Sequence, residues 1–238
     1  KSAIKTIGIT MGDPQGIGPE VIVKAFKSAQ IPRSVNYVGI GDRRLFKGIA
    51  ASIVDVPYRL AGEGSLKFLD RGIDLIKAGV IDALVTAPLS KEEVNRYSKG
   101  FKGHTEYLAH AFDVTKFDMM FVADKVRLAL LTRHVPLKDV PRMITQKSVL
   151  TCIELMHETL KGTFKIKNPN IAVLGLNPHA GENGLLGMED KRHIKPAIDV
   201  AINKGINVQG PFPADTFFCF DKGFDGLIVL SPVEGLSP

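Results

Sequence analysis

The chain has 238 residues, which is enough for one large domain or two small α/β lobes. Its formal net charge of +6 is spread along the sequence without any nucleic-acid-recognition motif, which disfavours nucleic-acid binding and suits an enzyme that attracts phosphates or carboxylates. Two separated cysteines, Cys152 and Cys219, indicate no disulfide framework, and no run of about 18 apolar residues is present, so we expect a cytoplasmic protein without a membrane span.

The first part of the sequence alternates apolar, strand-like runs with helical segments. Strands are predicted for residues 4–11, 35–40 and 81–86. Helices are predicted for residues 19–29, 43–49 and 65–78. The first helix opens with Pro19, which suits the first helical turn, and the third has apolar residues at helical spacing. This alternation is typical of βαβ units in a buried parallel sheet and therefore predicts an α/β fold.

The second part keeps the same alternation. Strands are predicted for residues 118–123, 127–131, 170–176 and 226–230. Helices are predicted for residues 105–112, 145–160 and 190–203. The Gly- and Lys-rich residues 95–103 could act as a hinge, so we predict two lobes, 1–97 and 98–238.

Four predicted strands end in segments that are rich in polar residues and glycine. These segments are residues 10–20 (TMGDPQGIGPE), 86–91 (TAPLSK), 132–137 (TRHVPL) and 175–182 (GLNPHAGE). Ligands bind beyond the carboxyl ends of parallel strands, so the four segments define a candidate site. The glycines at 12, 16 and 18 lack dinucleotide-fingerprint spacing, and they indicate either a phosphate-cradling loop or a tight turn that needs glycine.

Five residues are candidates for direct roles in chemistry. His134 and His179 each follow an apolar strand, so they could bind a divalent metal together or be two unrelated histidines. Asp215 could be a further ligand, orient the substrate, accept a proton or cap a helix. His104 and Thr105 begin a predicted helix, where they could bind a phosphate or carboxylate or belong to a helix cap.

Six segments, in this order, resemble the sequence blocks of the 4-hydroxythreonine-4-phosphate dehydrogenase family of vitamin B6 synthesis. They are residues 10–20, 86–91, 103–107, 134–139, 175–182 and 210–216. The resemblance runs from about Ile7 to Leu230. It implies a two-lobed α/β/α fold akin to isocitrate and isopropylmalate dehydrogenases, with the active site in a cleft between the lobes. It also implies a homodimer with a shared active site, and NAD or NADP bound without a Rossmann fingerprint.

The resemblance further implies roles for residues at matching positions. His104 and Thr105 would hold a small phosphorylated hydroxy-amino acid, and the second lobe would carry the metal and substrate motifs. His134 and His179 would bind a divalent metal such as zinc, manganese, cobalt or magnesium. Asp215 matches a polar residue close to that metal and is the candidate catalytic residue. The NAD contacts are not assigned by any of these motifs.

The implied reaction is oxidation of 4-phosphooxy-L-threonine at C3 by NAD⁺, followed by metal-assisted loss of CO₂. The product would be 3-amino-2-oxopropyl phosphate, a precursor in pyridoxal 5′-phosphate biosynthesis. A metal on the C3 hydroxyl would lower its pKa and stabilise the negative charge that develops in both steps. Two alternatives remain: a catabolic dehydrogenase of 4-phospho-threonate, 4-phospho-erythronate or a dihydrodiol carboxylate, and a non-catalytic protein that binds phosphate ligands.

The sequence departs from the family after its last predicted strand. The family's third metal histidine, in a Tyr-His-Asp-Gln-Gly block, should follow Leu230, but Ser231 follows instead and no histidine comes after His193. Truncation, omission of an internal segment and natural loss of the metal site are three possible explanations. We favour an omitted internal segment, and the short spacing near residues 54–63 indicates another.

Overall fold

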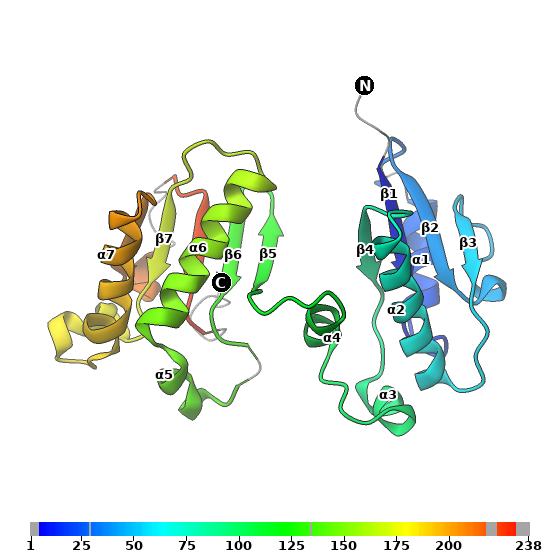
Figure 1. The fold of residues 1–238 in the computed structure, drawn as a ribbon, viewed down its shortest axis with the longest axis horizontal. Helices are drawn as coiled ribbons and strands as arrows, with labels where there is room; N and C mark the ends of the chain where they lie inside the picture. Colours follow the sequence, from blue (N-terminus) through cyan, green and yellow to red (C-terminus); the bar gives the residue numbers. More distant parts are fainter. Residues whose placement is uncertain (1–4, 29, 134, 218–222, 232–238) are drawn as a thin grey trace. The chain divides into compact units, whose positions relative to one another are not determined.

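The computed structural model describes residues 5–28, 30–133, 135–217 and 223–231, and the chain divides into two compact units (Figure 1). The first unit is Lys1–Val114 and the second is Thr115–Pro238. Each unit has its own sheet and its own buried apolar cluster. Among the described residues, no helix has the length and apolar character needed to cross a membrane.

The first unit is built on a four-stranded parallel sheet in the order β3-β2-β1-β4. The strands are β1 Thr6–Thr10, β2 Asn36–Gly41, β3 Ser52–Asp55 and β4 Ala83–Thr86. The helices are α1 Gly18–Lys27, the 3-10 turn η1 Arg43–Leu45, α2 Ala61–Lys77, α3 Lys91–Tyr97 and α4 His104–Ala111. Crossovers β1–α1–β2 and β3–α2–β4 run in opposite directions across the sheet, so the right-handed rule puts α1 and α2 on opposite faces.

The reversal of crossover direction creates a topological switch point between β1 and β4. In open α/β sheets the carboxyl ends of strands at such a point form a common ligand-binding position. The segments that follow β1 and β4 are residues 10–20 and 86–91, two of the four singled out from the sequence. The sheet therefore brings these two segments together.

The boundary between the units differs from the sequence-based prediction of lobes 1–97 and 98–238. Helix α4 lies in the first unit, because its Tyr107 and Leu108 pack against Leu69 of α2 and Phe101 in one apolar cluster. A Gly- and Lys-rich composition indicated a hinge, but the apolar face of the helix that follows has its packing partners on α2. His104 and Thr105 consequently belong to the first unit rather than to the second.

The second unit has a five-stranded sheet in the order β5-β6-β9-β7-β8. The strands are β5 Met119–Ala123, β6 Val126–Leu130, β7 Ile171–Leu174, β8 Val208–Phe212 and β9 Gly226–Val229. The helices are α5 Val140–Met143, α6 Gln146–Gly162, α7 Lys195–Asn203 and α8 Ala214–Phe217, with short turns η2 Leu137–Asp139, η3 Pro178–Gly184 and η4 Asp190–Ile194. Only the β5–β6 pair is antiparallel among these strands, and the other pairs are parallel.

Side-chain alternation along the strands divides the core of the second unit into two clusters. Val173 of β7 packs in one cluster with Met156 of α6 and Ile198 of α7. Its neighbour Leu174 packs in the other cluster with Phe217 of α8. Successive side chains of a strand point to opposite faces, so helices cover both sides of a sheet that is almost wholly apolar.

Candidate active site

The carboxyl ends of β6, β7, β8 and β9 lie along one edge of the second sheet, because these four strands are parallel. Residues 132–137 follow β6, residues 175–182 follow β7, and Asp215 follows β8. Strand β9 lies between β6 and β7. Of the predicted metal ligands here, His134 itself falls outside the described residues.

His179 and Asp215 come together at this edge. Nδ1 of His179 lies 3.2 Å from Oδ2 of Asp215, and the two side chains are 61% and 47% exposed. Two ligand atoms that each lie about 2.1 Å from a tetrahedral zinc ion are about 3.4 Å apart, so this spacing fits a pair on one cation. Imidazole and carboxylate donors also suit divalent zinc, manganese or cobalt. Among the described residues, no cluster of three such ligands is present.

Asp215 lies within a short helix and faces a histidine. Helix α8 begins at Ala214, so Asp215 lies inside its first turn and not at the preceding capping position. Its carboxylate is instead directed at His179, which comes from a segment 36 positions earlier in the chain. Of the four possible roles considered from the sequence, ligand, orienting group and proton acceptor remain compatible with this placement.

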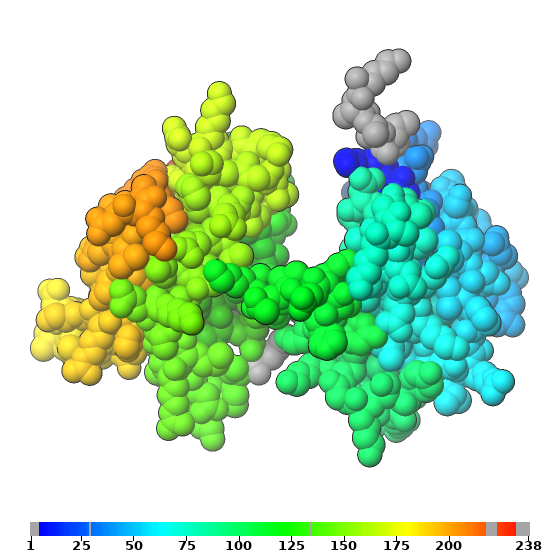
Figure 2. Space-filling model, in the orientation of Figure 1, coloured from blue at the N-terminus to red at the C-terminus, as the bar shows by residue number. Residues whose placement is uncertain are grey.

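His179 starts a turn of left-handed backbone. The φ angles of His179, Ala180 and Glu182 are 52°, 53° and 44°, and Gly181 and Asn183 between and after them are also positive. Left-handed conformation costs a residue with a β-carbon about 1–2 kcal/mol, so the surrounding structure must impose it. Figure 2 shows this segment, in yellow, projecting from the surface of the second unit beside α7.

The carboxylate of Asp190 anchors the segment that leads into this turn. Asp190 is only 3% exposed. Its Oδ1 accepts a hydrogen bond from the backbone N–H of Leu176 at 2.9 Å. Its Oδ2 accepts hydrogen bonds from the backbone N–H and the side-chain Nδ2 of Asn177 at 3.2 and 2.9 Å. These bonds fix the chain two residues before His179, which compensates part of the backbone strain.

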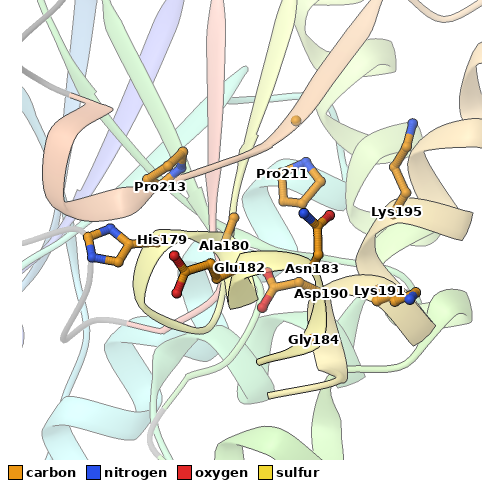
Figure 3. A pocket seen from close by; sticks show the side chains of 11 residues that line it. His179, Ala180, Glu182, Asn183, Gly184, Asp190, Lys191, Lys195, Pro211 and Pro213 are labelled. Carbon is orange, nitrogen blue, oxygen red and sulfur yellow. The ribbon is translucent and has the colours of Figure 1, made fainter. Parts of the chain in front are cut away.

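A cavity of about 540 Å³ opens between the left-handed turn and the segment from β8 to α8. Figure 3 shows His179 at one end of the cavity wall and Lys195 at the other, with Glu182 and Asn183 between them. Lys195 is paired with Asp199 at 2.7 Å. The cavity has the size of a small-molecule site and presents imidazole, carboxylate and ammonium groups.

His104 and Thr105 form a second candidate position, in the first unit. His104 begins α4, whose capping residue is Gly103 and therefore has no side chain to bond the first-turn N–H groups. Both residues are half-buried, and neither is the cap itself. Burial lowers the pKa of His104 and the nearby ammonium of Lys91 lowers it further, so the imidazole is neutral at pH 7. A neutral imidazole, a hydroxyl and free N–H groups together offer donors to an anion.

The glycine-rich turn after β1 is explained by close packing. Gly12 has a φ of 72°, and a β-carbon there would lie 2.1 Å from the carbonyl oxygen of Pro88. A β-carbon at Gly18 would lie 2.2 Å from the carbonyl oxygen of Met11. The backbone N–H of Asp13 also donates to Pro88 O at 2.9 Å. Two of the three glycines are thus required by backbone contacts, which favours the tight-turn interpretation over a phosphate cradle.

Comparison with known proteins gives the family. The family described as "Pyridoxal phosphate biosynthetic protein PdxA" matches residues 23–230. The chain belongs to the PdxA family. Membership makes it a dehydrogenase and implies a nicotinamide cofactor, NAD or NADP.

Relatives and solved structures agree with this assignment. A 4-hydroxythreonine-4-phosphate dehydrogenase from Desulforapulum autotrophicum is 34% identical over 98% of this chain and 79% of its own length. A D-threonate 4-phosphate dehydrogenase from Cupriavidus necator is 36% identical over 99% of this chain and 82% of its own. The crystal structure of 4-hydroxythreonine-4-phosphate dehydrogenase from Klebsiella pneumoniae is 29% identical, with a TM-score of 0.87 over 99% of this chain and 82% of that one. The predicted α/β fold and the resemblance to the 4-hydroxythreonine-4-phosphate dehydrogenase family are confirmed.

The alignments also bear on the spacing of the motifs. The match to the Cupriavidus protein extends over 274 positions, although this chain has 238 residues. The relative therefore contains internal residues that this chain lacks. This agrees with the expectation of shortened internal spacing.

Three residues of these sites had no role in the sequence interpretation. Asp190 is the first residue of the predicted helix 190–203, and its burial and its role in anchoring residues 176–177 appear only in the structure. Lys195 lies in the same predicted helix and lines the cavity, which no sequence pattern indicates. Lys91 is the last residue of the segment 86–91 (TAPLSK), a segment to which the sequence pattern assigns no specific role.

Proposed function

We propose that this PdxA-family dehydrogenase uses NAD⁺ and a divalent cation to oxidise 4-phosphooxy-L-threonine at C3, with loss of CO₂ to give 3-amino-2-oxopropyl phosphate for pyridoxal 5′-phosphate synthesis. The chain would work as a homodimer that shares its active site. The observation that supports the proposal most is the 3.2 Å pair of His179 and Asp215 at the strand-end edge of the second sheet.

In this proposal His134 and His179 would hold the cation, with the carboxylate of Asp215 beside it. His134 follows β6 and His179 follows β7, so the two segments start on either side of β9 at the same sheet edge. A divalent cation bound there supplies a Lewis acid that lowers the pKa of the substrate alcohol and stabilises negative charge. The left-handed turn and its Asp190 anchor would keep His179 oriented before the substrate arrives.

His104 and Thr105 would position the substrate, and Asp215 would take up the proton that the oxidation releases. His104 and Thr105 would donate hydrogen bonds to its anionic groups, and burial keeps the imidazole uncharged for this purpose. Asp215 would accept the proton of the C3 hydroxyl as the C3 hydride passes to NAD⁺, so the alcohol becomes a ketone and NADH forms. The β-keto acid then loses CO₂ and takes up one proton.

A second candidate is oxidation of D-threonate 4-phosphate. Relatives that carry this name, in one case as a putative assignment, are 36–37% identical to the chain, and relatives named for 4-hydroxythreonine 4-phosphate are 31–36% identical. The two acids both carry a phosphate ester and a C3 hydroxyl, and they differ at C2, where one has an amino group and the other a hydroxyl. Every motif discussed above could serve either acid.

Formation of NADH at 340 nm with each acid, in buffers containing zinc, manganese, cobalt or magnesium, would test the proposal. We expect turnover with one of the two acids and its loss on chelation of the metal. His179→Ala should lower kcat/KM by at least about 100-fold, whereas His110→Ala, at an exposed position of α4, should have little effect. Full activity of His179→Ala in zinc or manganese would refute the metal assignment. Phosphate-ligand binding without any turnover would indicate the non-catalytic alternative.

A further inference from the structure

Lys91 occupies a position where a lysine is electrostatically unfavourable for its own helix. It is the first residue of α3, and the positive end of a helix dipole favours acidic residues there. Glu92 and Glu93 follow the usual preference, and Ser90 already caps the helix by accepting a hydrogen bond from the Glu93 N–H at 3.2 Å. Helix formation therefore does not explain the lysine.

The ammonium of Lys91 lies beside the start of α4. A β-carbon at Gly103 would be 3.6 Å from Nζ of Lys91 and 3.3 Å from Oε2 of Glu106. Any side chain at position 103 would thus enter the space between these two charged groups. Within the described part of the chain, no acidic oxygen lies within 4.0 Å of the ammonium, so even Glu106 forms no ion pair with it.

Lys91 and His104 are close enough to interact electrostatically. The positive charge of Lys91 is one of the two causes that lower the pKa of His104, after burial. In the free protein this proximity gives the site an ammonium group and a neutral imidazole donor without a compensating carboxylate bond. Such an arrangement becomes favourable when an anion is bound between them.

We propose that Lys91 binds the phosphate group of the substrate together with His104 and Thr105. This inference rests on the proposed function, which places the substrate at His104 and Thr105, and it gives the TAPLSK segment a role. Lysine contributes a point charge, while the imidazole and the hydroxyl contribute directed hydrogen bonds. The 3.6 Å approach of its Nζ to position 103 brings this residue, which follows β4 in the chain, to the start of α4.

Inorganic phosphate is a suitable probe, used with the whole protein in the absence of metal and NAD⁺. The imidazole C–H resonances of His104, assigned by comparison with His104→Gln, report binding. We expect a saturable shift in the wild type and a roughly tenfold or greater weakening of phosphate affinity in Lys91→Met. Lys99→Met removes an exposed lysine two residues after the end of α3 and should leave the affinity unchanged.

Steady-state kinetics give a second readout. For the phosphorylated substrate, Lys91→Met should raise KM by roughly tenfold and leave the KM for NAD⁺ unchanged, and Lys91→Arg should recover part of the loss. Equal phosphate affinity in Lys91→Met and wild type would overturn the inference, even if the enzyme is active. Lys91-dependent phosphate binding without NADH formation from either acid would instead refute the proposed function and leave this inference standing.

Discussion

Replacing Asp190 with alanine should unfold the second unit at a markedly lower urea concentration, because this carboxylate anchors the segment before His179. Asp190 is 3% exposed. It accepts hydrogen bonds from the Leu176 N–H at 2.9 Å, the Asn177 N–H at 3.2 Å and the Asn177 Nδ2 at 2.9 Å. Alanine leaves the two backbone N–H groups without this acceptor, whereas Nδ2 of Asn177 keeps its second hydrogen bond, to Oε2 of Glu189 at 2.9 Å.

The magnitude follows from the number of donors. A buried donor left unpaired costs about 1–3 kcal/mol, and we take about 1 kcal/mol for each because Leu176 and Asn177 are only half-buried. The two backbone donors give about 2 kcal/mol, and the loss of one of the two hydrogen bonds of Asn177 Nδ2 adds about 1 kcal/mol, so the total is about 3 kcal/mol. With a urea m-value of about 1.5 kcal/mol/M for a domain of this size, the unfolding midpoint should fall by about 2 M.

Far-UV circular dichroism in urea would measure this shift, with Asp199→Ala as the matched control. Asp199 is a carboxylate close by in the sequence, but its side chain is 52% exposed and bonds only the exposed Lys195. Its removal should change the free energy of unfolding by less than about 0.5 kcal/mol. A midpoint for Asp190→Ala within about 0.3 M of wild type would refute the anchoring role.

Two further substitutions test the first unit. Gly12→Ala should lower the free energy of unfolding in urea by about 3 kcal/mol, because the new β-carbon would lie 2.1 Å from the carbonyl oxygen of Pro88. The control Gly48→Ala should cost only about 1 kcal/mol, because Gly48 also has a positive φ but no neighbour within 4 Å. Equal losses of unfolding free energy in Gly12→Ala and Gly48→Ala would show that the close contact with Pro88 does not determine stability at Gly12. The hydrogen-bonded guanidinium of Arg44 lowers the pKa of the buried Asp42 carboxyl to about 2. The ionised carboxylate therefore stabilises the folded protein by about 2 kcal/mol above pH 4, and this contribution is lost as the pH falls toward 2. Asp42→Asn should therefore unfold more easily than wild type at pH 7, by a difference that shrinks between pH 4 and pH 2.

Strands that form continuous apolar runs could be predicted from the sequence. Strands β1, β2, β4, β6, β7 and β9 all lie within or beside predicted ranges. The strand Ser52–Asp55 was not predicted, because its four residues are short of a full apolar run and its ends are exposed. The strand Val208–Phe212 was not predicted either, since Gly210 and Pro211 interrupt it. The helix predicted for residues 43–49 is only the 3-10 turn Arg43–Leu45.

The candidate site was predictable to the level of strand ends, but not to the level of geometry. Parallel strands put their carboxyl ends at one edge, and this rule is enough to expect His134 and His179 near each other. It does not reach Asp215, because Asp215 follows β8, a strand that the sequence pattern does not predict. It does not give the left-handed backbone of His179 and Ala180, because residues with a β-carbon avoid that conformation when isolated. The buried Asp190 that anchors the segment becomes recognisable only when its partners are known.

The strand order gives the second sheet its capacity for a shared ligand site. β9 follows the other described strands in the sequence but lies between β6 and β7 in the sheet. The segments that begin after Leu130 and Leu174 are therefore two strand spacings apart. The hydroxyl of Thr132 donates to the carbonyl of Leu230 at 2.6 Å, which ties the end of β6 to the end of β9. A side chain that follows β9 therefore starts between the segments of His134 and His179. The family resemblance implies a further metal-binding histidine after this strand, and the topology gives a physical reason for that position: a donor that follows the central strand starts between the other two histidines.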